Sequence, residues 1–366
     1  MHSNFNDLAI ILTWPDATIR GDEQWMMFFK KIGLVKNLNF KVGHTGIILV
    51  NPDDGMLLFY DFGRYITPRG YGRARSQLSD PLVAINIKAI LNNGKIDNIE
   101  DIIIFLETLK PAMYGEGKLL FTIVEGINYK LAKAYGDHCV LQGTYPYGAL
   151  AKNNNNCSRF ITRMLMKASK RFHHLHSINF PETLKSSPIS NLINAVPDRK
   201  IYSYTPEEGI VAKKMNRFQS LWFLIKQLGD NVFKHKAALL PDDRIIGAMQ
   251  YHTKPTTVPS DALYLGGVGD GAWYTIHAYS NEHLLIKRYT STGILEYIAV
   301  GEATQQFDVN TKFDITYDSH KLFTHVIQNN IKICISHIEQ LQLTNTKLKN
   351  VAIAQINASL LASCHY

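Results

Sequence analysis

A cysteine and a histidine, far apart in the sequence, are the residues best suited to covalent chemistry. Cys157 follows a run of asparagines at 153–156 and opens a segment whose apolar residues recur at helical spacing. A helix N-terminus carries a partial positive charge and unpaired N–H groups, which favour a thiolate and can stabilise an oxyanion. His44 opens an apolar run, residues 45–50, that is typical of a buried strand. The two residues together suggest a cysteine hydrolase in which His44 is the base.

An acidic residue is expected beside this histidine. Residues 51–55 (Asn-Pro-Asp-Asp-Gly) are turn formers between two apolar runs, which predicts a β-hairpin. If the turn is centred on residues 52–54, the end of the second strand returns to the level of His44. Asp61 is then the acid placed to orient the imidazole.

Residues 64–75 contain four arginines, with glycines and a proline at the bends, and predict an ordered loop. A solvated basic loop is the commoner case, and a rim that holds an anionic or polar substrate is the sharper hypothesis. Under the second hypothesis Arg64 and Tyr65, together with Asn156 before the cysteine, are candidate substrate-binding residues.

The competing interpretation of Cys157 is a buried, unreactive thiol, since such a cysteine on an amphipathic helix is common in protein cores. The polar asparagines before it argue against burial of the helix start. Cys139 and Cys334 lie among apolar residues, and Cys364 lies near the C-terminus.

No cofactor or metal is expected. The four cysteines show no C-x-x-C spacing, which argues against a zinc site or a redox pair. The histidines at 173, 174 and 176 have no acidic or thiol ligand nearby, so a solvated helix end is the more probable interpretation of that cluster than a metal site.

The elements that must position these residues change in character along the chain. In the first half, strands are predicted at 8–14, 40–50, 56–62, 83–87, 118–124 and 199–204, and helices at 23–32, 99–109, 127–135 and from 157 onward. A helix over 207–228 is expected to connect the halves. In the second half, strand-like runs at 262–265, 272–278, 284–289, 295–300, 313–318 and 324–335 predict an antiparallel sheet or small barrel.

The glycine-rich run at 266–271 invites a nucleotide-binding interpretation. The residues that follow it favour a strand, whereas a dinucleotide fingerprint opens a helix. A turn between two strands is therefore predicted there, and Asn329-Asn330 is expected to turn the last hairpin.

Two short motifs resemble a known family. Residues 43–47 (Gly-His-Thr-Gly-Ile) and 156–160 (Asn-Cys-Ser-Arg-Phe) resemble the circularly permuted branch of the NlpC-type papain-like superfamily, which includes lecithin retinol acyltransferase-like proteins. Residues 60–65 (Tyr-Asp-Phe-Gly-Arg-Tyr), with Pro68 and Gly72-Arg73, resemble an uncharacterised bacterial group within it, typical of Bacteroidetes. The resemblance covers about the first two hundred residues.

The resemblance implies an α+β fold in which a histidine strand precedes a cysteine helix beside an antiparallel sheet. It implies Cys157 as nucleophile, His44 as base and then acid, and a polar third residue, for which Asp61 is the candidate. The predicted organisation is a permuted NlpC-like domain at 1–205, a helical linker at 206–245 and a β-rich domain of unknown role at 246–366.

Composition narrows the function further. The chain has 366 residues, 46% hydrophobic content and a formal charge of +8, but its basic residues are scattered, so no nucleic-acid partner is expected. No apolar stretch reaches the ~20 residues of a membrane span, and no signal peptide is recognised, which predicts a cytoplasmic protein. The oligomeric state stays open.

Three functions are compatible with these observations. The first is an amidase or peptidase that cleaves an amide, ester or thioester in a peptide-like or acyl small molecule through an acyl-thioester on Cys157. The second is a catalytically silent papain-like scaffold that acts as a binding module. The third, lipid acyl transfer, requires an apolar groove or a membrane-facing helix that the sequence does not reveal.

Overall fold

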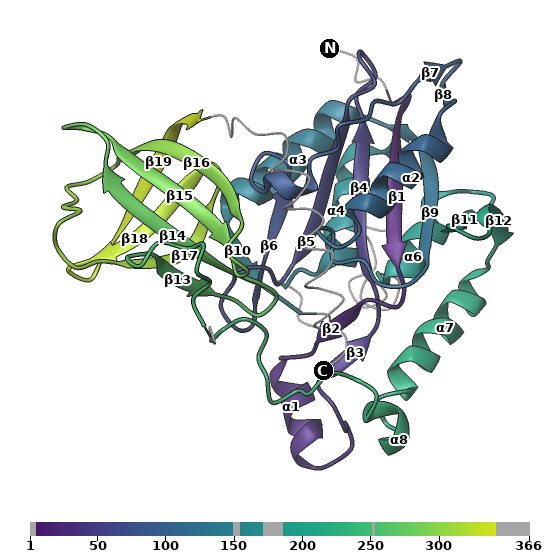
Figure 1. Cartoon of the computed structure of the whole chain (residues 1–366). Helices are drawn as coiled ribbons and strands as arrows, with labels where there is room; N and C mark the ends of the chain where they lie inside the picture. Colours follow the sequence, from purple (N-terminus) through teal and green to yellow (C-terminus); the bar gives the residue numbers. More distant parts are fainter. Residues whose placement is uncertain (1–4, 149–153, 171–185, 251–252, 342–366) are drawn as a thin grey trace.

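The computed structural model describes residues 5–148, 154–170, 186–250 and 253–341, and arranges them as two β-sheet bodies (Figure 1). The histidines at 173, 174 and 176, Cys364 and the stretch at 348–361 lie outside the described residues. The α+β class and the β-rich second half predicted from the sequence are confirmed.

The first body is built on an eight-stranded sheet with the order β10-β6-β5-β4-β1-β9-β11-β12. Every pair of neighbouring strands in this sheet is antiparallel. The strands are β1 (Asp7–Trp14), β4 (His44–Val50), β5 (Leu57–Gly63), β6 (Tyr71–Ser76), β9 (Leu119–Ile127), β10 (Thr144–Pro146), β11 (Lys200–Thr205) and β12 (Gly209–Lys214).

Helices cover both faces of this sheet, which explains why its central strands are continuously apolar. Along β1, Ile11 packs with helices α4 (Cys157–Ala168) and α6 (Pro188–Ala195), whereas Ile10 packs on the other face with helix α2 (Ile99–Leu109). Helix α3 (Tyr129–Gln142) lies beside α4. The core therefore consists of two layers separated by β1, β4 and β5.

Smaller elements lie at both ends of the first body (Figure 1). Strands β2 (Thr18–Arg20) and β3 (Asn39–Lys41) pair with each other and enclose α1 (Gln24–Lys31) between them in sequence. Helices α7 (Arg217–Gly229) and α8 (Lys234–Ala237) follow β12 and lie at the same end as α1, and a short hairpin of β7 (Leu91–Asn92) and β8 (Lys95–Ile96), at the other end, precedes α2. No helix in the described ranges is long and apolar enough to cross a membrane.

The second body is a near-closed antiparallel barrel with the order β13-β14-β15-β16-β19-β18-β17. Its strands are β13 (Leu263–Gly266), β14 (Gly271–Ala278), β15 (Leu284–Thr290), β16 (Leu295–Ala303), β17 (Asp314–His320), β18 (Phe323–Gln328) and β19 (Ile331–Leu341). The edge strands β13 and β17 meet, where the Tyr317 hydroxyl donates to the Gly266 carbonyl at 3.1 Å. The expected turn at Asn329-Asn330 is present, with both residues at positive φ.

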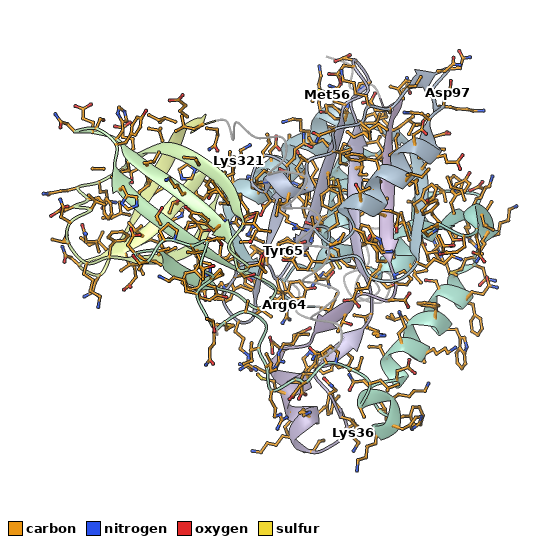
Figure 2. All side chains as sticks on the ribbon, viewed as in Figure 1. Lys36, Met56, Arg64, Tyr65, Asp97 and Lys321 are labelled. Atoms are coloured by element: carbon orange, nitrogen blue, oxygen red, sulfur yellow. The ribbon has the colours of Figure 1, made fainter. Side chains whose placement is uncertain are left out.

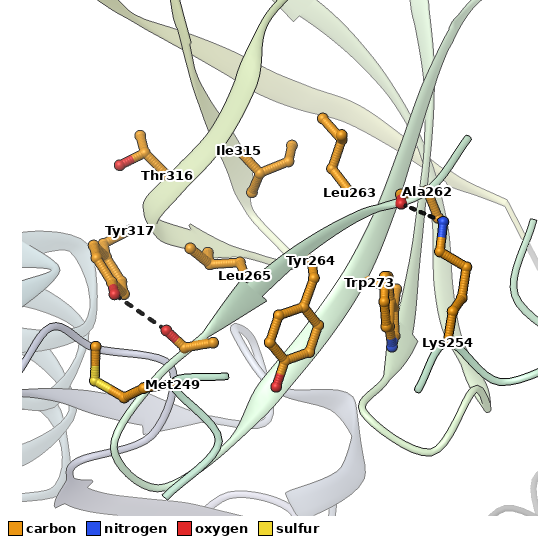
Figure 3. Close-up of a pocket in the computed structure, with 11 residues that line it drawn as sticks. Met249, Lys254, Ala262, Leu263, Tyr264, Leu265, Trp273, Ile315, Thr316 and Tyr317 are labelled. Carbon is orange, nitrogen blue, oxygen red and sulfur yellow. Dashed lines mark hydrogen bonds between the residues drawn. The ribbon is translucent and has the colours of Figure 1, made fainter. Parts of the chain in front are cut away.

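A groove of about 600 Å³ lies along the seam between β13 and β17 (Figure 3). Tyr264 and Trp273 line it, and the Lys254 ammonium is bonded to backbone carbonyls that include that of Ala262, at 2.9 Å. The groove therefore offers both polar and apolar surface.

The glycine-rich turn between β13 and β14 joins the two bodies. The Gly269 N–H donates to the Arg64 carbonyl at 2.7 Å, and a Cβ on Gly267 would lie 2.4 Å from the Tyr65 carbonyl oxygen. The neighbouring Ile66 belongs to the apolar core of the barrel. Only residues without side chains permit this close approach, so the turn predicted from the sequence also forms the contact between the bodies.

Three predicted elements differ in the structure. Residues 83–87 do not form a strand, and the third strand of the hairpin region is β6, which was expected to be loop. The arginines of β6 are tolerated inside because buried carboxylates neutralise them. The helix expected over 207–228 begins only at Arg217, since β12 first extends the sheet.

Candidate active site

His44 and Asp61 lie on neighbouring strands and contact each other. The hairpin pairs Gly46 of β4 with Asp61 of β5, so the imidazole and the carboxylate project on the same side of the pair. His44 Nε2 lies 3.0 Å from Asp61 Oδ2. The turn at residues 51–55 sets this register, because Gly55 adopts a positive φ of 71° that other residues rarely reach.

Cys157 is the first residue of α4, as the asparagine run suggested. The Asn156 side chain accepts a hydrogen bond from the Arg159 N–H at 2.9 Å and so caps the helix. Helix α4 packs across β4 and β5, and Phe160 stacks on Phe62 at a ring distance of 6.1 Å. This packing places the Cys157 thiol close enough to the His44 ring for the sulfur to influence the pKa of that ring. Asp61 contacts Nε2, so a second partner of the ring would have to use Nδ1.

The electrostatics of His44 follow from these two neighbours. Burial lowers the pKa of the ring, but the hydrogen bonds and charges of Asp61 and Cys157 outweigh burial and raise the pKa to about 9. The fully buried Trp14 indole stacks on the ring, with the two planes within 9°. The imidazole is therefore held in a dry pocket with its proton retained at neutral pH.

Asp61 is the most highly coordinated group of the site. Its carboxylate is completely buried and accepts two hydrogen bonds from Arg75, at 3.0 and 2.9 Å, one from Tyr65 and one from His44. Burial alone would raise the pKa of this carboxyl, but the charge of Arg75 and the hydrogen bond of His44 lower it. Asp61 is therefore ionised and fixed in orientation.

Residues beyond Asp61 connect its carboxylate to the barrel. The Arg75 guanidinium lies over the rings of Tyr65 and Tyr114, at 3.8 and 5.1 Å from their centroids. Tyr114 and Asp270, in the glycine-rich turn of the barrel, interact electrostatically, and burial raises the pKa of both groups. A chain of contacts thus runs from the barrel to Asp61.

Two of the predicted substrate-binding residues, Arg64 and Tyr65, are buried, and the third, Asn156, is half-buried. Arg64 is 8% exposed and donates to Asp22 at 2.8 Å, Tyr65 is bonded to Asp61, and Asn156 caps α4. The interpretation of residues 64–75 as a solvated basic loop is wrong, because Asp22, Asp61 and Asp80 neutralise the arginines of this segment within the fold. Whether any of the three predicted residues touches a substrate stays a prediction.

The expected exposure of the helix start is also corrected. Cys157 is only 3% exposed, since the asparagine side chains bond to the backbone and so can pack inward. The sulfur is nevertheless beside the imidazole, so it is not sealed in purely apolar packing.

Sequence reasoning missed Arg75, Tyr114 and Trp14. Arg75 pairs directly with Asp61 across β5 and β6, a signal that would have been visible had residues 71–76 been recognised as a strand. Trp14 pairs with His44 across β1 and β4. In the described ranges, no group of three or more His, Cys, Asp or Glu side chains could hold a metal ion.

Comparisons with known proteins match parts of the two bodies to different family models. Residues 9–174 match the family described as type VI secretion system effector TseH-like, and residues 262–338 match the DUF6695 C-terminal domain. A search of curated proteins found no match. A crystal structure of the type VI secretion system effector TseH is 16% identical, with a TM-score of 0.35, and the match covers 57% of this chain and 99% of that chain. A likeness this distant supports no argument about function.

Two predictions are overturned by the family match. The resemblance to the permuted NlpC-type papain-like superfamily is wrong, because the family that matches residues 9–174 is the TseH-like one. The cytoplasmic location is contradicted as well, since that family consists of effectors of a secretion system. The first body of the chain is therefore similar to TseH-like type VI secretion effectors, and its barrel is similar to the DUF6695 C-terminal domain.

Proposed function

We propose that the chain is a cysteine hydrolase that cleaves an amide, ester or thioester through an acyl-thioester on Cys157. The observation that carries this proposal is the position of His44, whose Nε2 lies 3.0 Å from Asp61 Oδ2 and whose ring is influenced by the nearby Cys157. A nucleophile, a base and a group that orients the base are the parts that nucleophilic acyl transfer needs.

In the first half of the reaction, the Cys157 proton resides on His44 and the thiolate attacks the carbonyl carbon. The backbone N–H of Cys157, at the helix start, has no intrahelical partner and can donate to the oxyanion that forms. Asp61 stabilises the imidazolium through its 3.0 Å contact. The imidazolium then gives its proton to the leaving amine, alcohol or thiol as the bond to carbon breaks.

In the second half, water attacks the thioester carbon. Neutral His44 takes the water proton, a second oxyanion forms at the same donors, and its collapse releases the acid and the Cys157 thiolate. His44 is again protonated at the end of this step, which restores the starting pair.

The match of residues 9–174 supports a setting for this chemistry. We take the chain to be an effector that a secretion system delivers to target cells, with hydrolysis at Cys157 as its activity. The proposed substrate is a peptide-like or acyl molecule whose carbonyl carbon reaches the sulfur.

Alkylation of the native protein by iodoacetamide tests the proposal, with each cysteine quantified by mass spectrometry. Cys139 and Cys334 are partly exposed whereas Cys157 is buried, so exposure alone predicts that Cys157 reacts last. Burial also raises the pKa of Cys139. We expect Cys157 to react first near neutral pH, because the His44 imidazole beside it can take its proton. Alkylation of Cys157 no faster than that of Cys139 contradicts the proposal.

A further inference from the structure

Helices α1 and α7–α8 and their connecting segments carry a concentration of exposed apolar side chains. Residues 24–34 and 217–245 hold 13 of the 25 large apolar side chains that are exposed in the described ranges. The most exposed of them are Phe28, Ile32, Phe218, Trp222, Leu239 and Ile245, each at 57% or more. Single exposed apolar residues are ordinary, but a cluster of this extent marks an interaction surface.

On α7 these side chains form one helix face. Phe218, Leu221, Trp222 and Ile225 are spaced by three and four residues and are all exposed, whereas Phe223 packs against the core of the first body. Helix α1 has no buried residue at all. Both helices therefore present large apolar side chains that the described part of the chain leaves exposed, Trp25 and Phe28 among them on α1.

The two helices belong to one surface. The Lys36 N–H donates to the Asn231 carbonyl at 3.2 Å, and Asn37 bonds to the Asn231 side chain at 2.9 Å and to the Ala237 carbonyl at 3.3 Å. These bonds tie the loop after α1 to the turn between α7 and α8. Figures 1 and 2 show α1 and α8 projecting from the same end of the molecule, with Lys36 beside them.

The polar groups of this surface are predominantly cationic. Residues 24–36 and 217–245 contain eight Lys and Arg residues and three Asp residues. Each of the three carboxylates, at positions 230, 242 and 243, is already paired with a basic side chain. Lys31, Lys226 and Lys234 have no acidic partner in the described ranges and are exposed. The free charge of the surface is therefore positive.

We propose that this surface docks on an anionic membrane, with the apolar faces of α1 and α7 at the level of the lipid headgroups. Exposed Trp and Phe side chains, flanked by lysines, are the combination that interfacial helices use on anionic lipids. A protein partner would also cover apolar residues, but the excess of unpaired lysines favours a surface of uniform negative charge.

The docking surface lies near the candidate active site. The Gln227 side chain of α7 donates to the Pro15 carbonyl at 2.5 Å, and Pro15 follows Trp14, which stacks on His44. Docking through α7 would therefore bring the end of the sheet that carries Trp14 and His44 toward the bilayer. The proposal concerns lipid binding alone and does not depend on catalysis.

Flotation of the full chain with vesicles tests the proposal. We expect binding to vesicles of equal parts phosphatidylglycerol and phosphatidylcholine, and at least tenfold weaker binding to phosphatidylcholine alone. The double variant Phe218→Ser with Trp222→Ser should lose about tenfold or more of the affinity. The matched control, Ile331→Ser with Ile338→Ser, replaces two exposed side chains of β19 and should bind like the unmodified chain.

The charge is tested separately. Lys31→Glu, Lys226→Glu and Lys234→Glu should each weaken binding about fivefold or more at low salt, whereas Lys88→Glu and Lys95→Glu on the distant side should not. Thermal melts verify that each exposed substitution leaves the fold intact. Failure to float with anionic vesicles, or equal binding to both vesicle types, overturns the proposal. A self-association that Phe218→Ser removes, without any lipid binding, overturns it in favour of a contact between copies of the chain.

Discussion

Two histidines are buried among the described residues, and their surroundings drive their protonation in opposite directions. His44 lies between Asp61 and Cys157, and the pKa of its ring is raised to about 9. His320, at the end of β17, is completely buried, and burial together with the positive charge of Arg73 lowers its pKa to about 3. Burial alone favours the neutral ring in both places. A buried ring therefore keeps its proton only where a carboxylate touches it.

A parallel contrast holds for two buried carboxylates. Asp61 and Asp80 are each bonded to two nitrogens of an arginine of β6, Arg75 and Arg73 respectively. Asp80 takes its remaining hydrogen bond from Ser79, whereas Asp61 takes one from His44. The same kind of Arg–Asp ion pair thus stabilises the fold at Asp80 and orients a candidate base at Asp61.

The largest expected effect is a difference in Cys157 alkylation between variants of the two buried histidines. His44→Ala removes the proton acceptor of Cys157, and we expect alkylation of Cys157 near neutral pH to slow by about a hundredfold. His320→Ala should leave that rate within a factor of about two, since His320 lies in the barrel. Equal rates in His44→Ala and the unmodified chain would remove His44 from the chemistry.

Substitution of the two carboxylates, Asp61 and Asp80, should change the alkylation rate of Cys157 by different but smaller factors. Asp61→Asn keeps the shape but removes the charge that holds the proton on His44, so Cys157 alkylation near neutral pH should fall about tenfold. The same substitution at Asp80 should lower the thermal midpoint and leave the alkylation rate of the folded protein unchanged. A similar slowing in both variants would show that Asp61 acts through stability alone.

The pH dependence of stability should have opposite signs at the two histidines. His44 binds its proton more tightly when folded, so its contribution is complete below pH 6.5 and is lost as pH rises through about 9. His320 is neutral when folded, so its contribution is lost as pH falls from 6.5 toward about 3.

Urea unfolding of the unmodified chain, His44→Gln and His320→Gln measures both effects. The difference in unfolding free energy from the unmodified chain should change by about 1 kcal/mol per pH unit in each window, falling with rising pH for His44 and with falling pH for His320. A difference that does not depend on pH in either window would contradict the corresponding assignment.

The smallest effect should come from the contact with the barrel. Asp270→Asn removes a charge two contacts away from Asp61, beyond Tyr114 and Arg75. We expect the pH profile of Cys157 alkylation to shift by a few tenths of a unit. The matched substitution Asp261→Asn, on an exposed part of the barrel, should not shift it. An identical profile in both variants would limit the barrel to a structural role.

Local features of the site were predictable from the sequence, and long-range ones were not. The turn at residues 51–55 fixed the register of Asp61 against His44, and the asparagine before Cys157 marked the helix start, because both depend on neighbours in the chain. The strand that carries Arg75 was missed, since a run of arginines is typical of a solvated loop unless buried carboxylates neutralise it. The packing of Gly267 against Tyr65 joins positions about two hundred residues apart, and no local pattern encodes it.

The proton on His44 is the central claim, and its titration tests that claim most directly. In the full chain, NMR of ring nitrogens can follow His44, assigned by comparison with His44→Gln. The account predicts a midpoint near pH 9, with a marked fall in Asp61→Asn. A midpoint at or below 6.5 in the unmodified chain would contradict it, because the imidazole would then be neutral where the Cys157 thiolate needs a charged partner.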